Sequence, residues 1–145
     1  MIGGGSRRVL ELAGRAADIV SIVPSLAAGV VGEETAAQAV AEKYAERVRW
    51  VRDAAGDRAD DVELQCWTAT VAVVPDADTV IEKLAPAFRL TPDELRAAPV
   101  VLIGPVEEII ETLRKRREEY GFSYIVVHEG EMDALVPVIA ELAGT

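Results

Sequence analysis

Short apolar runs alternate with amphipathic segments along the whole chain, and this alternation narrows the folds that it can adopt. Runs such as 18–23 (DIVSIV) and 122–127 (FSYIVV) are almost wholly apolar, which is typical of strands buried in a parallel sheet. Parallel strands need crossover helices between them, so the pattern predicts an α/β fold built from βα units. After an N-terminal strand stub, the predicted strands are 18–23, 62–74 and 122–127, and the predicted helices are 6–17, 34–57, 78–88, 91–98, 104–121 and 131–145.

Local signals refine three of these elements. The run 62–74 would extend about 43 Å as one strand at about 3.3 Å per residue, so we expect a bend or a break in it. Thr91 and Glu94 have the spacing of a capping box, which predicts a helix start. Gly121 follows a helix with early glutamates and late basic residues, and it predicts the end of that helix.

Composition excludes several classes of protein. With 145 residues, half of them hydrophobic, the chain can form one domain with a real core. The net charge is −10, from 25 acidic and 15 basic residues, which argues against nucleic acid and anionic membrane as partners. No run approaches the roughly 18 apolar residues of a membrane span. A single cysteine, Cys66, rules out an internal disulfide, and we expect a cytoplasmic protein.

A glycine turn opens the chain. Gly3, Gly4 and Gly5 are followed by Ser6 and two arginines, and a helical pattern begins at once. The segment lacks the lysine of a P-loop, and Arg8 stands where a dinucleotide fingerprint has its third glycine. Such a turn exposes backbone N–H groups at the positive end of a helix, where a phosphate is favoured. The alternative, a strand-to-helix turn that binds nothing, stays open.

Two further residues are weighed as site candidates. His128 follows a predicted strand directly and so lies at the rim where parallel α/β folds bind ligands. The favoured interpretation is nevertheless a surface loop histidine. One histidine and one cysteine do not make a transition-metal site. Cys66 lies within a predicted strand beside Trp67 and is interpreted as a core residue.

Two architectures satisfy the alternation. One is a small, open, doubly wound sheet, and the other is part of a (β/α)8 barrel. A full barrel needs about 250 residues, whereas this chain holds at most four βα units. The segment 75–99, rich in proline and aspartate, is predicted to be an insertion between a strand and its returning helix.

Four segments of the chain resemble luciferase-like flavin and deazaflavin oxidoreductases. The first is IGGGSRRVLELAGRAADIV, where the family reads roughly I-G-G, a helix and then A-x-x-A-D. The later VLIGPVEEIIETLRKRREEYGFSYIVV is similar to their Gly turn, acidic helix start and G-x-S/D-x-I-V-V strand. WVRDAAGDR between them also fits, and PVIAELAGT resembles the end of actinobacterial-type members that use the deazaflavin coenzyme F-420. The segments follow the family's order over essentially the whole chain.

The resemblance implies a fold and a cofactor site. The family is a (β/α)8 barrel of about twice this length, and the match falls on its C-terminal half, so 1–145 would be a single partial domain. Met1 would then lie at the end of the fifth strand. The cofactor phosphate would be held by backbone N–H groups of the turn formed by Gly3, Gly4, Gly5 and Ser6.

The resemblance also implies a reaction class. It is hydride transfer or monooxygenation on an unknown small-molecule substrate, with coenzyme F-420 as the cofactor and FMN as the alternative. The family's substrate-acting residues lie mostly in the half that has no counterpart here, so no catalytic residue is named. Where family members often carry Gly-Thr, this chain has Gly104 and Pro105, which removes any contact from that threonine.

A second hypothesis is not enzymatic. It is a half-barrel module that self-assembles or binds a phosphorylated ligand without chemistry. Half a barrel leaves two open sheet edges and an uncovered sheet face, which we expect to be apolar, so a homo-oligomer is predicted.

Overall fold

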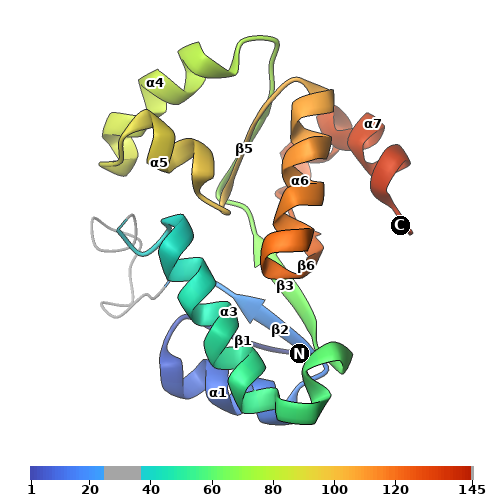
Figure 1. The fold of residues 1–145 in the computed structure, drawn as a ribbon. Helices are drawn as coiled ribbons and strands as arrows, with labels where there is room; N and C mark the ends of the chain where they lie inside the picture. Colours follow the sequence, from blue (N-terminus) through green and yellow to red (C-terminus); the bar gives the residue numbers. More distant parts are fainter. Residues whose placement is uncertain (25–36, 145) are drawn as a thin grey trace.

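The computed structural model describes residues 1–24 and 37–144 and shows parallel strands alternating with helices (Figure 1). The strands are β1 (Ile2–Gly4), β2 (Ile19–Ile22), β3 (Glu63–Trp67), β4 (Thr70–Val73), β5 (Val101–Gly104) and β6 (Phe122–Val126). The helices are α1 (Arg7–Ala16), α3 (Ala41–Ala55), α4 (Ala77–Phe88), α5 (Pro92–Ala97), α6 (Val106–Tyr120) and α7 (Met132–Leu142), with 3-10 turns η1 (Gly56–Asp61) and η2 (Glu129–Glu131). None of the described helices has the length and apolar character needed to cross a membrane.

The main sheet has four parallel strands in the order β1-β2-β3-β6. The helices beside this sheet contact one another in the same order, α1 with α3, α3 with α6, and α6 with α7, while α4 contacts α5. A second parallel pair, β4-β5, lies beyond the carboxyl end of β3. The predicted α/β fold with a parallel sheet is therefore confirmed, and its main sheet has four strands.

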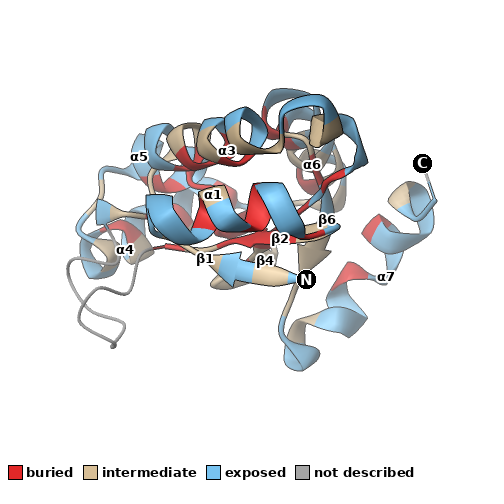
Figure 2. Ribbon diagram, turned by 90° about the horizontal axis from the view of Figure 1, so that it is seen from below, coloured by how far each residue is buried: buried red, intermediate tan, exposed pale blue. Residues whose placement is uncertain are grey.

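One face of the main sheet packs against the helices (Figure 2). The strand register places Val20, Leu64 and Phe122 in one row across β2, β3 and β6, and all three are buried in the main core. Tyr44 of α3 is fully buried above this row, with its ring 6.1 Å from the ring of Phe122. Burial of these apolar side chains between sheet and helices supplies the main stabilisation of the fold.

The opposite face of the sheet is not the apolar surface that we expected. The register aligns Gly3, Ser21, Gln65 and Tyr124 in one row, which places small and polar side chains where apolar ones were predicted. The prediction that 122–127 is buried on both faces is also wrong, because Ser123 and Tyr124 are exposed. The physical reason is that β6 is an edge strand, with helices covering one of its faces only.

The local signals agree with the structure in most places. The predicted break in 62–74 falls at residues 68–69, between β3 and β4. Thr91 and Glu94 form the predicted capping box, and Gly121 ends α6 with a φ of 81°. Pro105 is the N-cap of α6, one residue before the helix begins. Of the predicted helix 34–57, residues 34–36 lie outside the described residues and regular helix begins at Ala41.

Strand β5 was not predicted. Its four residues pair with β4, and α4 and α5 occupy most of 75–99 between the two strands. Arg116 of α6 secures the entry to β5, because its buried guanidinium donates to the carbonyl oxygens of Ala98, Pro99 and Val101 at 2.9–3.0 Å. The segment 75–99 is therefore connected to the rest of the fold by the pairing of β5 with β4 and by the hydrogen bonds from Arg116 of α6.

Candidate functional site

The carboxyl ends of the main strands share one edge of the sheet, which is where parallel α/β folds carry their ligand sites. β1 ends at Gly4, β2 at Ile22, β3 at Trp67 and β6 at Val126. The predicted glycine turn follows β1 directly, and His128 follows β6. The structure therefore places both sequence candidates at the functional rim, on strands at opposite edges of the sheet.

The glycine turn leads from β1 into the first turn of α1. Ser6 is the N-cap of α1, with extended backbone angles, and its carbonyl accepts the first helical hydrogen bond from Leu10 N–H at 3.0 Å. The Ser6 side chain does not cap the helix. The N–H groups at the start of an α-helix have no partners within the helix. The turn therefore offers N–H donors and an exposed serine hydroxyl at the positive end of α1.

Close packing explains two of the three glycines. A Cβ added to Gly4 would lie 2.5 Å from Cγ1 of Val9, and one added to Gly3 would lie 3.2 Å from Cβ of Ser21. The positive-φ glycines of the described chain do not include Gly3, Gly4 or Gly5. The turn therefore needs glycine because its backbone packs closely against neighbouring side chains, and not because it adopts a left-handed conformation.

Arg47 of α3 forms a hydrogen bond with this turn. It is 2% exposed, and its Nε donates to the carbonyl oxygen of Gly5 at 3.1 Å. Its two terminal nitrogens donate to the carbonyl and side-chain oxygens of Gln38 at 2.7 and 2.6 Å. All three acceptors are uncharged, so they do not neutralise the guanidinium. Burial lowers the pKa of Arg47, but an arginine starts high enough to stay charged.

Sequence reasoning missed Arg47. Its signal was present, because Arg47 falls within the apolar stripe of α3 that contains Tyr44, Val48 and Val51. A charged residue on a buried helix face is rare and is retained only with partners. The partner, Gly5, is 42 residues away in sequence, and only the fold brings the two together.

The two arginines after the turn differ in their contacts. Arg7 forms an ion pair with Glu11 one turn along α1, with Nε 2.7 Å from Oε1, and this hydrogen bond raises its pKa. Its side chain is 70% exposed. Arg8 is exposed as well. The charge of Arg7 is therefore paired within α1.

His128 lies on the surface, whereas Cys66 lies in the core. His128 is exposed, its backbone N–H donates to Glu131 at 3.0 Å, and its ring packs edge-on to Trp67 with 5.6 Å between centroids. This is the surface loop position that we favoured. Cys66 is 1% exposed in the core, as predicted, and burial raises the pKa of its thiol to about 12. Such a thiol is not a nucleophile near neutral pH.

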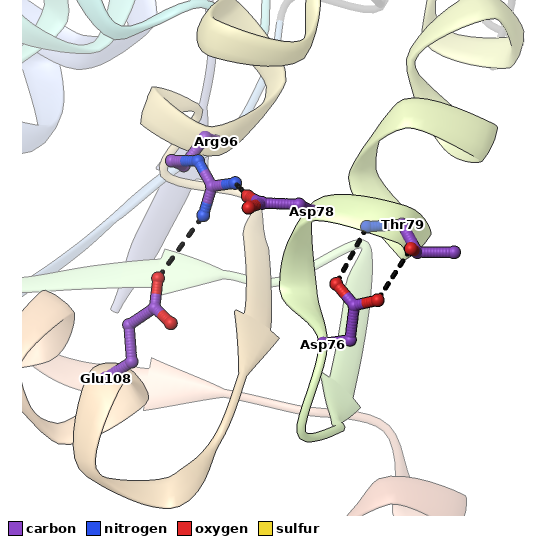
Figure 3. A network of polar contacts seen from close by, with 5 residues as sticks. All are labelled: Asp76, Asp78, Thr79, Arg96 and Glu108. Carbon is purple, nitrogen blue, oxygen red and sulfur yellow. Dashed lines mark hydrogen bonds and ion pairs between the residues drawn. The ribbon is translucent and has the colours of Figure 1, made fainter.

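A second polar cluster lies at the carboxyl ends of β4 and β5 (Figure 3). Arg96 of α5 forms ion pairs with Asp78 in the first turn of α4 and with Glu108 in the first turn of α6. Asp76 caps α4 by accepting from N–H and Oγ1 of Thr79 at 3.1 and 2.6 Å. These exposed contacts join three helix termini. Within the described ranges no group of three or more His, Cys, Asp or Glu residues is arranged to hold a metal ion.

Comparison with known proteins identifies the fold. No protein-family model matches the chain, and a search of curated proteins finds no similar sequence. The coenzyme F-420-dependent tetrahydromethanopterin reductase of Methanopyrus kandleri is a structural neighbour, with a TM-score of 0.59 and 11% identity over 97% of this chain and 48% of its own. A riboflavin lyase solved with modified FMN and riboflavin is another, with a TM-score of 0.58 and 14% identity over 96% of this chain and 42% of its own.

These comparisons confirm the predicted fold class. The chain is an α/β structure of parallel βα units that corresponds to about half of a (β/α)8 barrel. It spans less than half the length of each of the two neighbours. Both neighbours are enzymes whose names include F-420 or flavin. At these identities the likeness concerns the fold alone.

Proposed function

We propose that the chain is the phosphate-binding C-terminal half of a luciferase-like oxidoreductase barrel. In this proposal the turn Gly3–Ser6 binds the phosphate of coenzyme F-420, with FMN as the alternative cofactor. The observation that carries the proposal is an uncapped glycine turn at the carboxyl end of β1 with a buried guanidinium 3.1 Å from its Gly5 carbonyl. N–H groups that point at a phosphate, together with a cation on the far side of the turn, favour the binding of a phosphate.

The described residues fit such a group. The N–H groups of the turn and the Ser6 hydroxyl would donate to phosphate oxygens, while Gly4 lets the chain approach α1 closely. Arg47 orients the turn by holding the Gly5 carbonyl on the side of α3. When bound, the flavin or deazaflavin ring supplies hydride transfer, or oxygen activation in the case of reduced flavin. No described residue is assigned to the reacting atoms.

The choice of F-420 over FMN rests on the C-terminal segment PVIAELAGT. The two structural neighbours support both cofactors equally, since one name contains F-420 and the other FMN. The two cofactors share a phosphate after the ribityl chain, so the same turn serves either. Comparing the affinities of the two cofactors would decide between them.

The test is the affinity of the chain for cofactors with and without the phosphate. Calorimetric titration with FMN should show binding at least about tenfold tighter than riboflavin, because charge-assisted hydrogen bonds contribute about 1.5–3 kcal/mol each. F-420 should likewise bind more tightly than the phosphate-free deazariboflavin. Replacing Gly5 by Val should abolish the difference, since a branched side chain would obstruct the N–H groups. Equal affinities for FMN and riboflavin would contradict the proposal.

The second candidate is a half-barrel module that binds a phosphorylated ligand without chemistry. It is favoured by the described residues themselves, none of which is assigned to the reacting atoms. The two candidates differ in how the ring is held. An enzyme site encloses the ring and shifts its visible absorption, whereas a module that holds the phosphate alone leaves the spectrum as it is in water. Absorption spectra of bound F-420 and FMN separate them.

A further inference from the structure

Within residues 1–24 and 37–144, both the sheet and the helix layer end without a neighbouring element. The main sheet ends at β1 on one side and β6 on the other, and the helix layer ends at α1 and α7. Figure 1 shows α1 and α7 at opposite ends of the molecule, and among the described helices α7 contacts α6. Each end presents an edge strand with unpaired backbone groups and a helix with one free side.

Helix α7 carries an apolar stripe on its free side. Met132, Val136 and Ile139 are spaced four and three residues apart, so they share one face, and they are 50%, 58% and 47% exposed. Glu141 lies on the other side, where its carboxylate forms a 2.7 Å ion pair with Arg114 of α6. Met132 and Val136 therefore face away from α6, toward the place where a further helix of the layer would stand, while Ile139 also lines a groove shared with α6 and β6.

Helix α1 carries a matching stripe. Val9, Leu12 and Ala16 are spaced three and four residues apart and are all exposed, with Leu12 at 52%. On the other side of the helix, Glu11 and Trp50 of α3 line the same groove, so that side faces α3. The stripe of α1 therefore faces away from the helix layer, as that of α7 does.

An apolar groove runs beside the open edge of β6. It has a volume of about 210 Å³ and lies between β6, α6 and α7. Its apolar lining includes Phe122 and Ile125 from β6 together with Ile139 and Leu142 from α7. A strand added beside β6 would be covered by α7, and its helix-facing side chain would enter this groove. β1 has such a side chain, the half-buried Ile2, whose register places it in the row of Val20.

We propose that a second copy of this chain occupies both ends. β1 of each copy pairs in parallel with β6 of the other, Ile2 enters the groove, and the stripe of α1 packs on the stripe of α7. The two copies are related by a two-fold axis along the barrel, which makes both contacts identical and closes an eight-stranded barrel. The dimer goes beyond the proposed cofactor site and does not depend on it.

Charge complementarity supports this occupant. Arg8 is exposed on α1, whereas Glu129 and Asp133 are exposed at the start of α7 and no lysine or arginine follows Arg117 in the chain. Each helix returns antiparallel to its strand, so α1 and α7 of paired copies run in the same direction. Arg8 and Asp133 are both the second residue of their helices and so stand at the same level. Although each copy is acidic overall, the contact of α1 with α7 thus brings residues of opposite charge together.

The first test is the mass of the chain by sedimentation equilibrium at about 0.15 M salt, close to physiological. Wild type should sediment at twice its 15.5 kDa, with a mass that falls on dilution. Val136→Asp should weaken the dimer at least about tenfold, because it places a charge in the apolar contact. Ala134→Asp makes the same change about half a turn away on α7 and should have no effect. Circular dichroism verifies that each variant is folded.

A charge exchange tests the pairing of α1 with α7. Arg8→Glu alone and Asp133→Arg alone should each weaken self-association, since both contacts of the dimer then bring like charges together. An equimolar mixture of the two variants should recover the dimer, because each contact in the mixed species again has one acid and one base. A dimer that survives both variants would overturn the proposed arrangement, as would a mixture that fails to recover. A folded wild type that stays at 15.5 kDa would overturn the second copy as the occupant.

Discussion

The guanidinium of Arg47 donates a 3.1 Å hydrogen bond from Nε to the carbonyl oxygen of Gly5, 42 residues earlier in the chain. This bond holds a backbone acceptor on the protein side of the glycine turn. A carbonyl oxygen on the ligand side would repel a phosphate, whereas N–H groups attract it. The Arg47–Gly5 bond therefore connects the core of α3 to the orientation of the candidate site.

Arg47→Met should lower both stability and phosphate selectivity. The oxygens of Gly5 and Gln38 would lose their donor inside the protein, so the free energy of unfolding should fall by about 2–4 kcal/mol. Urea denaturation measures this loss, and the ratio of FMN to riboflavin affinity measures the selectivity. Arg49→Met removes an exposed guanidinium of the same helix and should change neither. A stable Arg47→Met chain with unchanged selectivity would contradict the role of this bond.

Gly4→Ala should destabilise the chain by about 1–3 kcal/mol, which is typical of overpacking. The added methyl group would lie 2.5 Å from Cγ1 and 3.1 Å from Cβ of Val9, so the Val9 side chain or α1 itself must shift. Gly130→Ala is the matched control, because a methyl group there would meet no atom within 4 Å. Thermal unfolding of the two variants measures the difference. Equal melting temperatures would show that the turn is not closely packed on α1.

Tyr44→Phe should raise the free energy of unfolding by up to about 1 kcal/mol. The Tyr44 hydroxyl is buried and has no hydrogen-bond partner among the described residues, so its removal ends an uncompensated desolvation cost. Tyr124→Phe removes a hydroxyl from a ring that is 39% exposed and should have no effect. A loss of stability in Tyr44→Phe would mean that the hydroxyl is bonded in the native protein.

The Cys66 thiol should react only when the chain unfolds. Burial raises its pKa from an ordinary 9.0 to about 12, so the folded protein contains almost no thiolate at pH 8. Alkylation by iodoacetamide should therefore follow the fraction unfolded as urea is added. Above pH 9 the thiol loses its proton in the unfolded chain before it does so in the folded protein. The free energy of unfolding should therefore fall as pH rises toward 12, by at most about 1.4 kcal/mol per pH unit from this residue. Cys66→Ala should lack that part of the pH dependence.

Local sequence patterns predicted the elements that local physics determines. The capping box of Thr91 and Glu94, the left-handed Gly121 and the break in 62–74 depend on neighbouring residues, and the structure confirms all three. The order of strands and helices followed from apolar periodicity in the same way. These features required no knowledge of contacts between distant parts of the chain.

Contacts between distant segments account for the rest. β5 has only four residues, and its pairing with β4 is determined by a tertiary contact rather than by its own sequence. The apolar run VVLI between Pro99 and Gly104 was the available signal for it. Arg47 acquires its role from Gly5 through the fold. The polar row of Ser21 and Gln65 becomes visible only when the register of three strands is known.

The central claim, that the glycine turn binds a cofactor phosphate, is tested most directly by nuclear magnetic resonance of the ¹⁵N-labelled chain. On addition of FMN, the amide resonances of Gly4, Gly5, Ser6 and Arg7 should shift to saturation, and riboflavin at equal concentration should leave them unchanged. F-420 should shift the same amides. Shifts confined to other parts of the chain, or identical shifts with riboflavin, would contradict the account.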